Sequence, residues 1–336
     1  MSLIYKRRVN HLSPLDAFRD YWGEIMPFAR RIDRKLFVLP LVVLKSIEWG
    51  IYRWYKTPVR RFYGVRGNEL IYMITRRCTD KCAKCGIWEN PEAPEDHIPI
   101  ACFIDCMIRL HDNLYQVTLT GGEPLVYKDD VLLIAREAAR HGISMVTVTN
   151  GFLIDEAFLM EYGRLGHILV VSLDTMDREK WGSFRGRDHY DRVMGNIALA
   201  ISILGTQLRI QSVLSRESSD EIPAVKEYCE AHGLSHVIQP YMDFGGYWHD
   251  AAPYTSTSES CAARKNICIY PNGDVVKCFD HHRIPLAREP LGNIVKEDIV
   301  TILCKKRATE VSRIMKGCDL PCKRLSCNVP KAIYNA

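Results

Sequence analysis

The stretch Cys78-Thr79-Asp80-Lys81-Cys82-Ala83-Lys84-Cys85 is followed, further along the chain, by the stretch Gly121-Gly122-Glu123-Pro124. The cysteines of the first stretch have the spacing Cys-x3-Cys-x2-Cys and suit an iron–sulfur cluster, which they leave one ligand short of four. An iron without a protein ligand keeps an open coordination position, as a catalytic zinc does. The first stretch therefore predicts a cluster at which something other than protein binds.

These two motifs together resemble those of the radical S-adenosylmethionine (SAM) superfamily. The resemblance implies a [4Fe-4S] cluster on Cys78, Cys82 and Cys85 that chelates SAM. It also implies reductive cleavage of SAM to a 5′-deoxyadenosyl radical, which abstracts hydrogen from an unactivated carbon. A zinc knuckle is the alternative, but zinc sites usually show cysteine pairs and four ligands. The family usually has an aromatic residue before the third cysteine, whereas this chain has Lys84.

From Glu69 onward, short β-branched or aromatic runs alternate with amphipathic helical stretches. This βα rhythm predicts an α/β fold with a parallel sheet and helices outside it. Six such units resemble the partial (β/α)6 TIM-like barrel of radical SAM proteins, whose reactive residues gather at the C-terminal ends of the strands. The predicted strands are 69–75, 116–120, 144–149, 167–172, 207–214 and 236–240, and the predicted helices are 101–110, 129–141, 156–162, 190–204 and 219–232.

The resemblance also implies where SAM is held. The two glycines of Gly121-Gly122 let the backbone approach a ligand closely, and Glu123 is expected to be a charge partner of SAM or a wall beside it. An ordinary strand-to-helix turn is the alternative for this motif. Arg187 is expected to grip the SAM carboxylate, because a planar guanidinium suits a carboxylate; a surface pair with a neighbouring aspartate is the alternative. The expected SAM contacts are Gly121, Gly122, Glu123, Pro124, Asn150, Ser172, Arg187 and Gln211, and no catalytic residue is assigned.

A second group of cysteines begins at Cys261. The pattern Cys261-x11-Gly273-x4-Cys278 resembles the opening of the SPASM or twitch extension of radical SAM enzymes, and Asn272-Gly273 predicts a hairpin turn. We expect one auxiliary [4Fe-4S] cluster, because the cysteine pattern is too short for two. A four-cysteine zinc site is the alternative. Cys261 and Cys278 are the expected ligands, the others come from Cys268, Cys318, Cys322 and Cys327, and Cys102, Cys106, Cys229 and Cys304 are expected to be buried helix residues.

Basic residues are concentrated in the N-terminal fifth of the chain. Residues 1–66 hold 14 Lys or Arg against 5 Asp or Glu, although the net charge of the chain is only +5. This excess favours an anionic surface as the partner of the segment. Residues 41–56 place apolar and basic side chains on different faces of a predicted helix, which suits a membrane surface. Packing of that helix against the barrel or across a dimer is the alternative.

The sequence predicts three regions: a helical basic segment over 1–66, a barrel over 67–250 and an auxiliary-cluster region over 251–336. Residues 36–44 are apolar but fall short of the roughly 20 residues that span a bilayer. The first residues do not read as a signal peptide, and 13 cysteines then favour a reducing compartment. A cytoplasmic protein with peripheral membrane contact through residues 1–66 is therefore expected.

The leading hypothesis is a radical SAM oxidoreductase that acts on a small-molecule or lipid-linked substrate and receives electrons from a flavodoxin- or ferredoxin-type donor. Dehydrogenation or epimerisation of a sugar or aminocyclitol and peptide maturation are the alternative reactions. A non-catalytic iron–sulfur electron carrier or scaffold is the alternative of another class, and no nucleic acid partner is expected. The loop 241–260 holds candidate substrate contacts, namely Asp243, Tyr247, Trp248, His249 and Asp250.

Overall fold

The computed structural model describes residues 69–111, 114, 116–215, 217–240, 266–279 and 288–316. The chain divides into two units, Met1–Arg66 and Gly67–Ala336, and every described residue belongs to the second. The predictions for residues 1–66 and for the loop 241–260 therefore lie outside the described residues. So do the predicted ligands Cys261, Cys318, Cys322 and Cys327.

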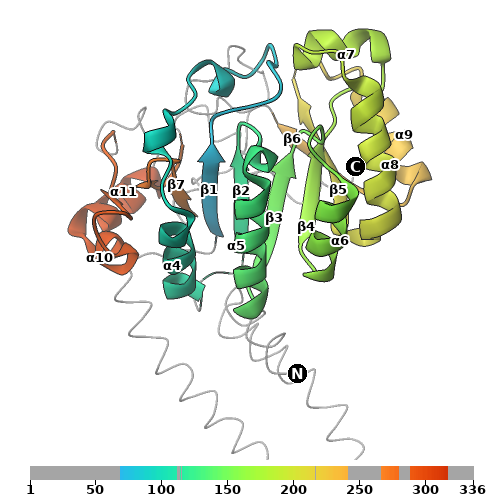
Figure 1. Ribbon diagram of the computed structural model, residues 1–336. Coiled ribbons are helices and arrows are strands. Elements are labelled where there is room, and N and C mark those ends of the chain that lie inside the picture. The colour runs from blue at the N-terminus through green and yellow to red at the C-terminus, as the bar shows by residue number, and fades with distance from the viewer. Residues whose placement is uncertain are drawn as a thin grey trace, which may run out of the picture. The chain divides into compact units, whose positions relative to one another are not determined.

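The described residues build one twisted, curved sheet with helices packed on its outer face (Figure 1). Six parallel strands run in the order β6-β5-β4-β3-β2-β1, so neighbours in sequence are neighbours in space. This arrangement confirms the partial (β/α)6 barrel. The strands are β1 (Glu69–Thr75), β2 (Gln116–Gly121), β3 (Ser144–Thr149), β4 (Ile168–Ser172), β5 (Leu208–Leu214) and β6 (Ser235–Pro240).

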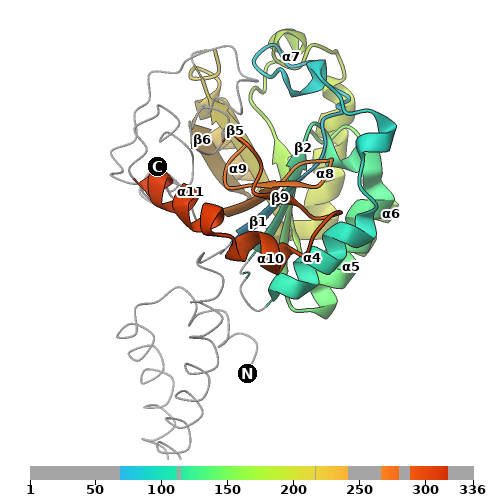
Figure 2. The ribbon, with the colours of Figure 1, turned by 90° about the vertical axis from the view of Figure 1, so that its left-hand side faces the viewer.

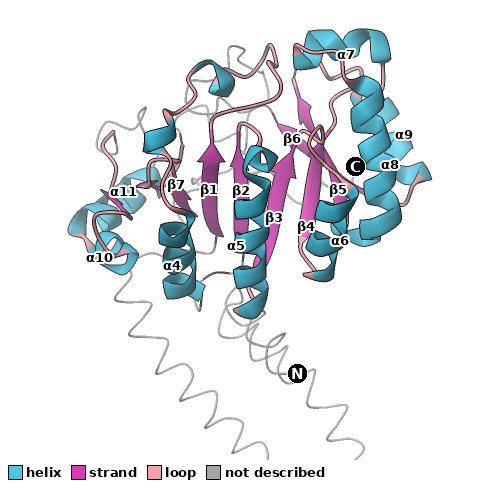
Figure 3. Ribbon diagram, viewed as in Figure 1, coloured by secondary structure: helices cyan, strands magenta, loops and turns pink. Residues whose placement is uncertain are grey.

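Helices follow the strands and cover the sheet, as Figure 3 shows for α4, α5, α6 and α8. Tyr72 of β1 stacks on Phe103 of α4, with ring centroids 4.2 Å apart. Tyr162 of α6 donates a hydrogen bond to Thr147 Oγ1 of β3 (3.0 Å). Alternate strand residues thus pack against helices, while the residues between them face the barrel interior. The helices are α4 (Ile100–Leu110), α5 (Lys128–Arg140), α6 (Glu156–Arg164), α7 (Arg178–Arg185), α8 (Tyr190–Leu204) and α9 (Ile222–Ala231).

Helix α7 was not predicted from the sequence. It begins at Asp177, whose carboxylate accepts hydrogen bonds from the N–H groups of Glu179 and Lys180, and it ends at Gly186 in the left-handed region (φ 67°). Only Trp181 and Arg185 of this helix are buried. A short polar helix with so few buried positions gives no periodic apolar signal, which is why the sequence pattern did not reveal it.

The C-terminal hairpin continues the same sheet. Strand β7 (Asn266–Ile269) pairs in parallel with β1, and β8 (Asp274–Val276) and β9 (Gly292–Asn293) follow in antiparallel pairing. The turn between β7 and β8 contains Gly273 at φ 84° and confirms the predicted hairpin. The auxiliary region is therefore joined to the barrel through the strand that precedes the cysteine loop.

Two further helices, α10 (Ile299–Cys304) and α11 (Lys306–Lys316), follow the hairpin. Helix α10 lies beside α4 (Figure 2), where Arg109 Nη1 is 3.1 Å from Asp298 Oδ2. The four cysteines assigned to helices do lie on helices; Cys106 and Cys229 are buried, whereas Cys102 and Cys304 are only half-buried. None of the helices described here is long and apolar enough to cross a membrane.

Candidate metal and cofactor site

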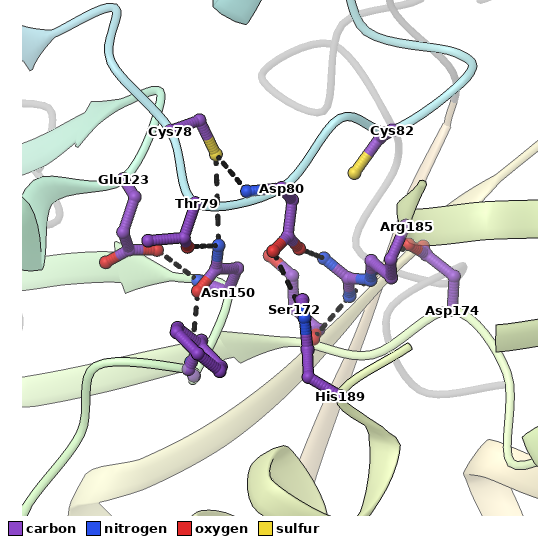
Figure 4. A network of polar contacts seen from close by, with 12 residues as sticks. Cys78, Thr79, Asp80, Cys82, Glu123, Asn150, Ser172, Asp174, Arg185 and His189 are labelled. Carbon is purple, nitrogen blue, oxygen red and sulfur yellow. Dashed lines mark hydrogen bonds and ion pairs between the residues drawn. The ribbon is translucent and has the colours of Figure 1, made fainter. Parts of the chain in front are cut away.

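The cysteine loop, residues 76–86, leaves the C-terminal end of β1. Its three cysteines are half-buried free thiols. The Asp80 N–H donates to Cys78 Sγ (3.4 Å), and the Cys85 N–H donates to the Cys82 carbonyl (3.0 Å). The Cys78 and Cys82 side chains both point from the loop toward the barrel (Figure 4). The sequence motif is thus presented at the edge of the sheet where the prediction placed it.

The Gly121-Gly122-Glu123 segment packs on the backbone at the start of the cysteine loop. The N–H groups of Gly122 and Glu123 donate to the carbonyls of Thr75 (2.7 Å) and Arg77 (2.8 Å). A Cβ on Gly121 would lie 2.2 Å from the Thr75 carbonyl, and one on Gly122 would lie 2.3 Å from that of Arg77. These glycines therefore allow one backbone segment to pack against another, and their contact with SAM stays a prediction.

Glu123 is fully buried and braces the end of β3. Its carboxylate accepts hydrogen bonds from Leu125 N (2.9 Å), Thr149 Oγ1 (2.7 Å) and Asn150 N (2.7 Å). Burial raises the pKa of Glu123 to about 7, although these hydrogen bonds act in the opposite direction. Pro124, also buried, begins the turn that leads into α5. The contact of Glu123 and Pro124 with SAM stays a prediction.

Asn150 connects β3 to the cysteine loop. Its Nδ2 donates to Thr79 Oγ1 (2.8 Å) and lies 3.8 Å from Cys78 Sγ, while its Oδ1 accepts from Phe152 N (3.0 Å). Because the Glu123 carboxylate holds the Asn150 backbone, a chain of hydrogen bonds runs from β2 through β3 to the first cysteine (Figure 4). The sequence indicated Asn150 as a cofactor contact; the structure gives it the additional task of orienting the loop.

Arg185 lies at the centre of a buried charged network on the other side of the loop. The residue is 4% exposed. Its Nη2 donates to the Ser172 carbonyl (2.6 Å) at the end of β4. Its Nη1 lies 3.6 Å from Asp80 Oδ2, and Nη2 lies 3.6 Å from Asp174 Oδ2 (Figure 4). One cation therefore pairs with a carboxylate from the cysteine loop and with another from the strand end.

Arg187, the arginine selected from the sequence, is exposed. It lies beyond Gly186, whose left-handed conformation reverses the chain after α7. A Cβ on Gly186 would lie 2.2 Å from the Lys81 carbonyl, so this turn packs directly on the cysteine loop. The structure thus buries Arg185 in this network, and the contact of Arg187 with the SAM carboxylate stays a prediction. The sequence could not distinguish the two arginines, because only the direction of α7 decides which of them faces inward.

Four residues of this network, Asp80, Lys84, Asp174 and His189, were not assigned from the sequence. His189 Nε2 lies 3.1 Å from Asp80 Oδ1, and Lys84 Nζ lies 3.1 Å from Asp174 Oδ1. Asp174 also accepts a hydrogen bond from Val213 N (2.8 Å). Two signals could have identified the acids: Asp80 lies between two cysteines with metal-ligand spacing, and Asp174 follows a buried strand. Lys84, which replaces the usual aromatic residue, thus ties the cysteine loop to the end of β4 by an ion pair.

Burial and charge oppose each other in this network. Burial alone would raise the pKa of Asp174, but Lys84 and Arg185 lower it below its usual value. Burial raises the pKa of Asp80 despite the nearby cations, and it lowers the pKa of His189. Asp174 is therefore the firmly ionised acid of the pair, and it holds both cations in place.

Ser172 and Gln211 lie opposite each other in the register of β4 and β5. Both are half-buried; Ser172 is the last residue of β4, whereas Gln211 is in the middle of β5. The Gln211 carbonyl accepts a hydrogen bond from Leu173 N (2.8 Å), and the Ser172 carbonyl accepts one from Arg185. The structure thus brings these predicted cofactor contacts together at one edge; their contact with SAM stays a prediction.

The residues of the cysteine loop fit an iron–sulfur cluster. Within the part of the chain that the structure describes, no three His, Cys, Asp or Glu side chains converge as ligands of a single metal ion. A four-iron cluster needs its thiolates further apart than one ion does. Burial raises the pKa of all three thiols, that of Cys85 to about 12. Arg185 and Lys84 partly offset this for Cys82, so the loop already carries cations that favour thiolates.

Two cysteines of the second group, Cys268 and Cys278, are among the described residues. Cys268 of β7 is opposite Ile71 of β1 and Val276 of β8. Cys278 follows the end of β8 and is buried, and the carbonyl of the next residue, Phe279, accepts a hydrogen bond from Tyr270 Oη (2.9 Å). Cys268 packs in an apolar cluster with Met73, Val276 and Phe279, and its thiol donates to the Lys277 carbonyl (3.6 Å). A ligand role for either cysteine stays a prediction.

Comparison with known sequences agrees with this geometry. Residues 72–223 match the model of the radical SAM superfamily, and residues 261–328 match that of SPASM, an iron-sulfur cluster-binding domain. The chain belongs to the radical SAM superfamily and carries a SPASM-type C-terminal region. The cofactors of this class are a SAM-binding [4Fe-4S] cluster, SAM itself and auxiliary iron–sulfur clusters.

Individual relatives are similar over part of their length. Molybdenum cofactor biosynthesis protein 1 of Drosophila melanogaster is 28% identical over 57% of this chain and 35% of its own length. GTP 3′,8-cyclase of Chlorobaculum tepidum is 28% identical over 51% of this chain and 53% of its own. The chain thus spans about half or less of these relatives. In fold it is similar to SuiB of Streptococcus suis bound to S-adenosylmethionine (TM-score 0.66, 15% identity, covering 93% of this chain and 84% of SuiB).

Proposed function

We propose that this protein cleaves SAM reductively and uses the product to abstract hydrogen from an unactivated C–H bond of a biosynthetic substrate. The observation that carries the proposal is the cysteine loop: three half-buried thiols with radical SAM spacing, held at the C-terminal edge of a partial barrel. Cys78, Cys82 and Cys85 would hold a [4Fe-4S] cluster, which would supply the electron for SAM cleavage. The protein's own residues position that group.

The hydrogen bonds and ion pairs around the cysteine loop indicate that different residues hold it from different elements. Glu123 and Asn150 hold the loop from β2 and β3. Arg185 holds it from α7 by pairing with Asp80, and it places positive charge near Cys82. Ser172 and Gln211 lie opposite each other in β4 and β5, and we propose that they contact SAM. Arg185 is thus a positioning residue that orients the loop and favours thiolates at the same time.

The pairing of β7 with β1 supports a substrate site on the barrel side of these two strands. The cysteine loop follows β1, and Cys268 of β7 lies opposite Ile71 of β1. A substrate bound inside the barrel would then be close both to the SAM site and to the start of the auxiliary-cluster region.

The test is anaerobic reconstitution with iron and sulfide, followed by dithionite and SAM, with detection of 5′-deoxyadenosine and methionine by mass spectrometry. We expect both products from the wild type and neither from Cys82→Ala. The matched control is Cys106→Ala, which removes a buried helix thiol and should leave the products unchanged. Intact clusters without 5′-deoxyadenosine would favour the electron carrier or scaffold instead.

A lipid or lipid-linked substrate is the finer proposal, and only the sequence of residues 1–66 supports it. Within this segment, several aromatic residues are followed by four basic ones, Arg30, Arg31, Arg34 and Lys35. Sedimentation of the full chain with anionic vesicles is expected, and replacement of these four residues by glutamate should abolish it. Equal sedimentation of both proteins would contradict the proposal and favour a sugar, aminocyclitol or peptide substrate reached from solution.

A further inference from the structure

Lys277 is a fully buried lysine directly before Cys278. It is 1% exposed, and no described residue accepts a hydrogen bond from its Nζ. The Cys268 thiol donates to its backbone carbonyl (3.6 Å), so the residue is fixed at the point where β8 ends.

A buried ammonium is strongly unfavourable unless an anion or several acceptors accompany it. Two less buried cations of this region do have partners: Lys305 Nζ pairs with Glu297 Oε1 (2.6 Å), and Arg307 Nη2 donates to the Glu289 carbonyl (3.0 Å). Lys277 has no comparable partner among the described side chains. An anionic or sulfur-rich group bound beside Nζ would supply the missing partner.

The SPASM match over residues 261–328 supplies such a group. An iron–sulfur cluster on thiolates carries net negative charge, and its sulfur atoms accept hydrogen bonds. Lys277 precedes one expected ligand, Cys278, and lies beside Cys268. We propose that Lys277 is the buried cation that faces the auxiliary iron–sulfur cluster and raises its reduction potential.

The physical basis is that reduction adds one electron to a group that is already negative. A cation or donor held close to the cluster stabilises the reduced form more than the oxidised form, so the midpoint potential rises. The burial of Lys277 strengthens this effect, because water does not screen the charge. The inference needs the auxiliary cluster but not SAM cleavage, so the two proposals fail in separate experiments.

The test is a redox titration monitored by electron paramagnetic resonance, on the full chain with Cys78, Cys82 and Cys85 replaced by alanine. Any cluster left in this background is the auxiliary one. Lys277→Met should make the equilibrium constant for one-electron reduction at least tenfold smaller, which corresponds to about 59 mV. Lys277→Arg should keep the wild-type midpoint. Lys305→Met is the matched control, because it removes a paired, partly exposed lysine of the same region.

An unchanged midpoint in Lys277→Met at equal iron and sulfide content would overturn the inference. So would the absence of any cluster in the background protein with Lys277 intact. If Lys277→Met does not take up iron, Lys277→Gln provides a second neutral variant. Loss of the cluster in both neutral variants but not in Lys277→Arg would support a required cation, whereas loss in all three would show that Lys277 only packs.

Discussion

At the scale of single residues, two glycines show how differently the same residue type is used. Gly122 has the backbone of Arg76 and Arg77 where its Cβ would be, at 2.6 and 2.3 Å from their carbonyl oxygens. Gly182, in the middle of α7, has open space at the same place. Replacement by alanine should therefore act in opposite directions at the two positions.

Gly122→Ala is expected to lower the free energy of unfolding by about 1–3 kcal/mol, because backbone cannot move aside as a flexible side chain can. Gly182→Ala should raise it by about 0.5–1 kcal/mol, since alanine favours the helix. Urea unfolding followed by circular dichroism measures both. Equal effects of the two substitutions would contradict the packing of the Gly-Gly segment on the cysteine loop.

The two arginines beside Gly186 give a second residue-scale prediction. Arg185→Met leaves Asp80 and Asp174 buried without their shared cation, and this should cost about 3–5 kcal/mol of stability. Arg187→Met removes an exposed side chain and should change stability by less than about 0.5 kcal/mol. The urea midpoints compare the two variants. A larger loss in Arg187→Met would mean that α7 presents the other arginine to the site.

Glu123 predicts a pH dependence in the iron-free protein. Its pKa rises from 4.5 in the unfolded chain to about 7 in the folded one, so the folded protein keeps a proton that the unfolded chain has lost. The stability from this group is complete below pH 4.5 and disappears as pH rises through 7. The loss is on the order of 3 kcal/mol. The free energy of unfolding should differ less between about pH 5 and about pH 8 in Glu123→Gln than in the wild type. An equal difference in the two proteins would contradict the assignment of this pH dependence to Glu123.

At the scale of elements, the cysteine loop is held by three contacts from different parts of the sheet. The end of β2 binds its first residues, Asn150 binds Thr79, and the Arg185 carbonyl accepts a hydrogen bond from Lys81 N (2.9 Å). Gly186 allows the last of these contacts, because any Cβ there would overlap the Lys81 carbonyl. The loop should therefore depend on α7 for its ability to bind iron.

Gly186→Ala should reduce the iron retained after reconstitution, because the turn would push the loop away from the barrel. The control is Gly233→Ala, which has a similar backbone conformation (φ 64° against 67°) but open space around its Cβ. Both variants carry the same backbone strain, so only the contact with the loop separates them. Iron and sulfide analysis is the measurement, and equal iron content in both variants would show that the turn does not support the loop.

The sequence was sufficient to predict the bounds of the strands and helices that have a repeating local pattern. Strands β1 and β3 and helix α8 begin and end where they were predicted, because period-two runs and capped amphipathic stretches are local signals. Helix α7 was missed for lack of such a signal. The burial of Arg185 rather than Arg187, the packing of Gly121 and Gly122 on the cysteine loop, and the pairing of β7 with β1 all depend on contacts between distant segments. No pattern within one segment contains that information.

At the scale of the whole molecule, one sheet joins both cysteine groups through β1 and β7. The cysteine loop and Cys268 are therefore fixed relative to one another by strand pairing. Two [4Fe-4S] clusters would give about eight irons per chain, and replacement of Cys78, Cys82 and Cys85 by alanine should leave about four. A variant with no remaining iron would remove the auxiliary cluster from the account.

The central claim is that one iron of the cluster on the cysteine loop is left open for SAM. The most direct measurement is the electron paramagnetic resonance spectrum of the dithionite-reduced protein with and without SAM. We predict that SAM changes the spectrum of the wild type and leaves that of the variant without Cys78, Cys82 and Cys85 unchanged. A wild-type spectrum that contains the signal of the loop cluster and does not respond to saturating SAM would contradict the account.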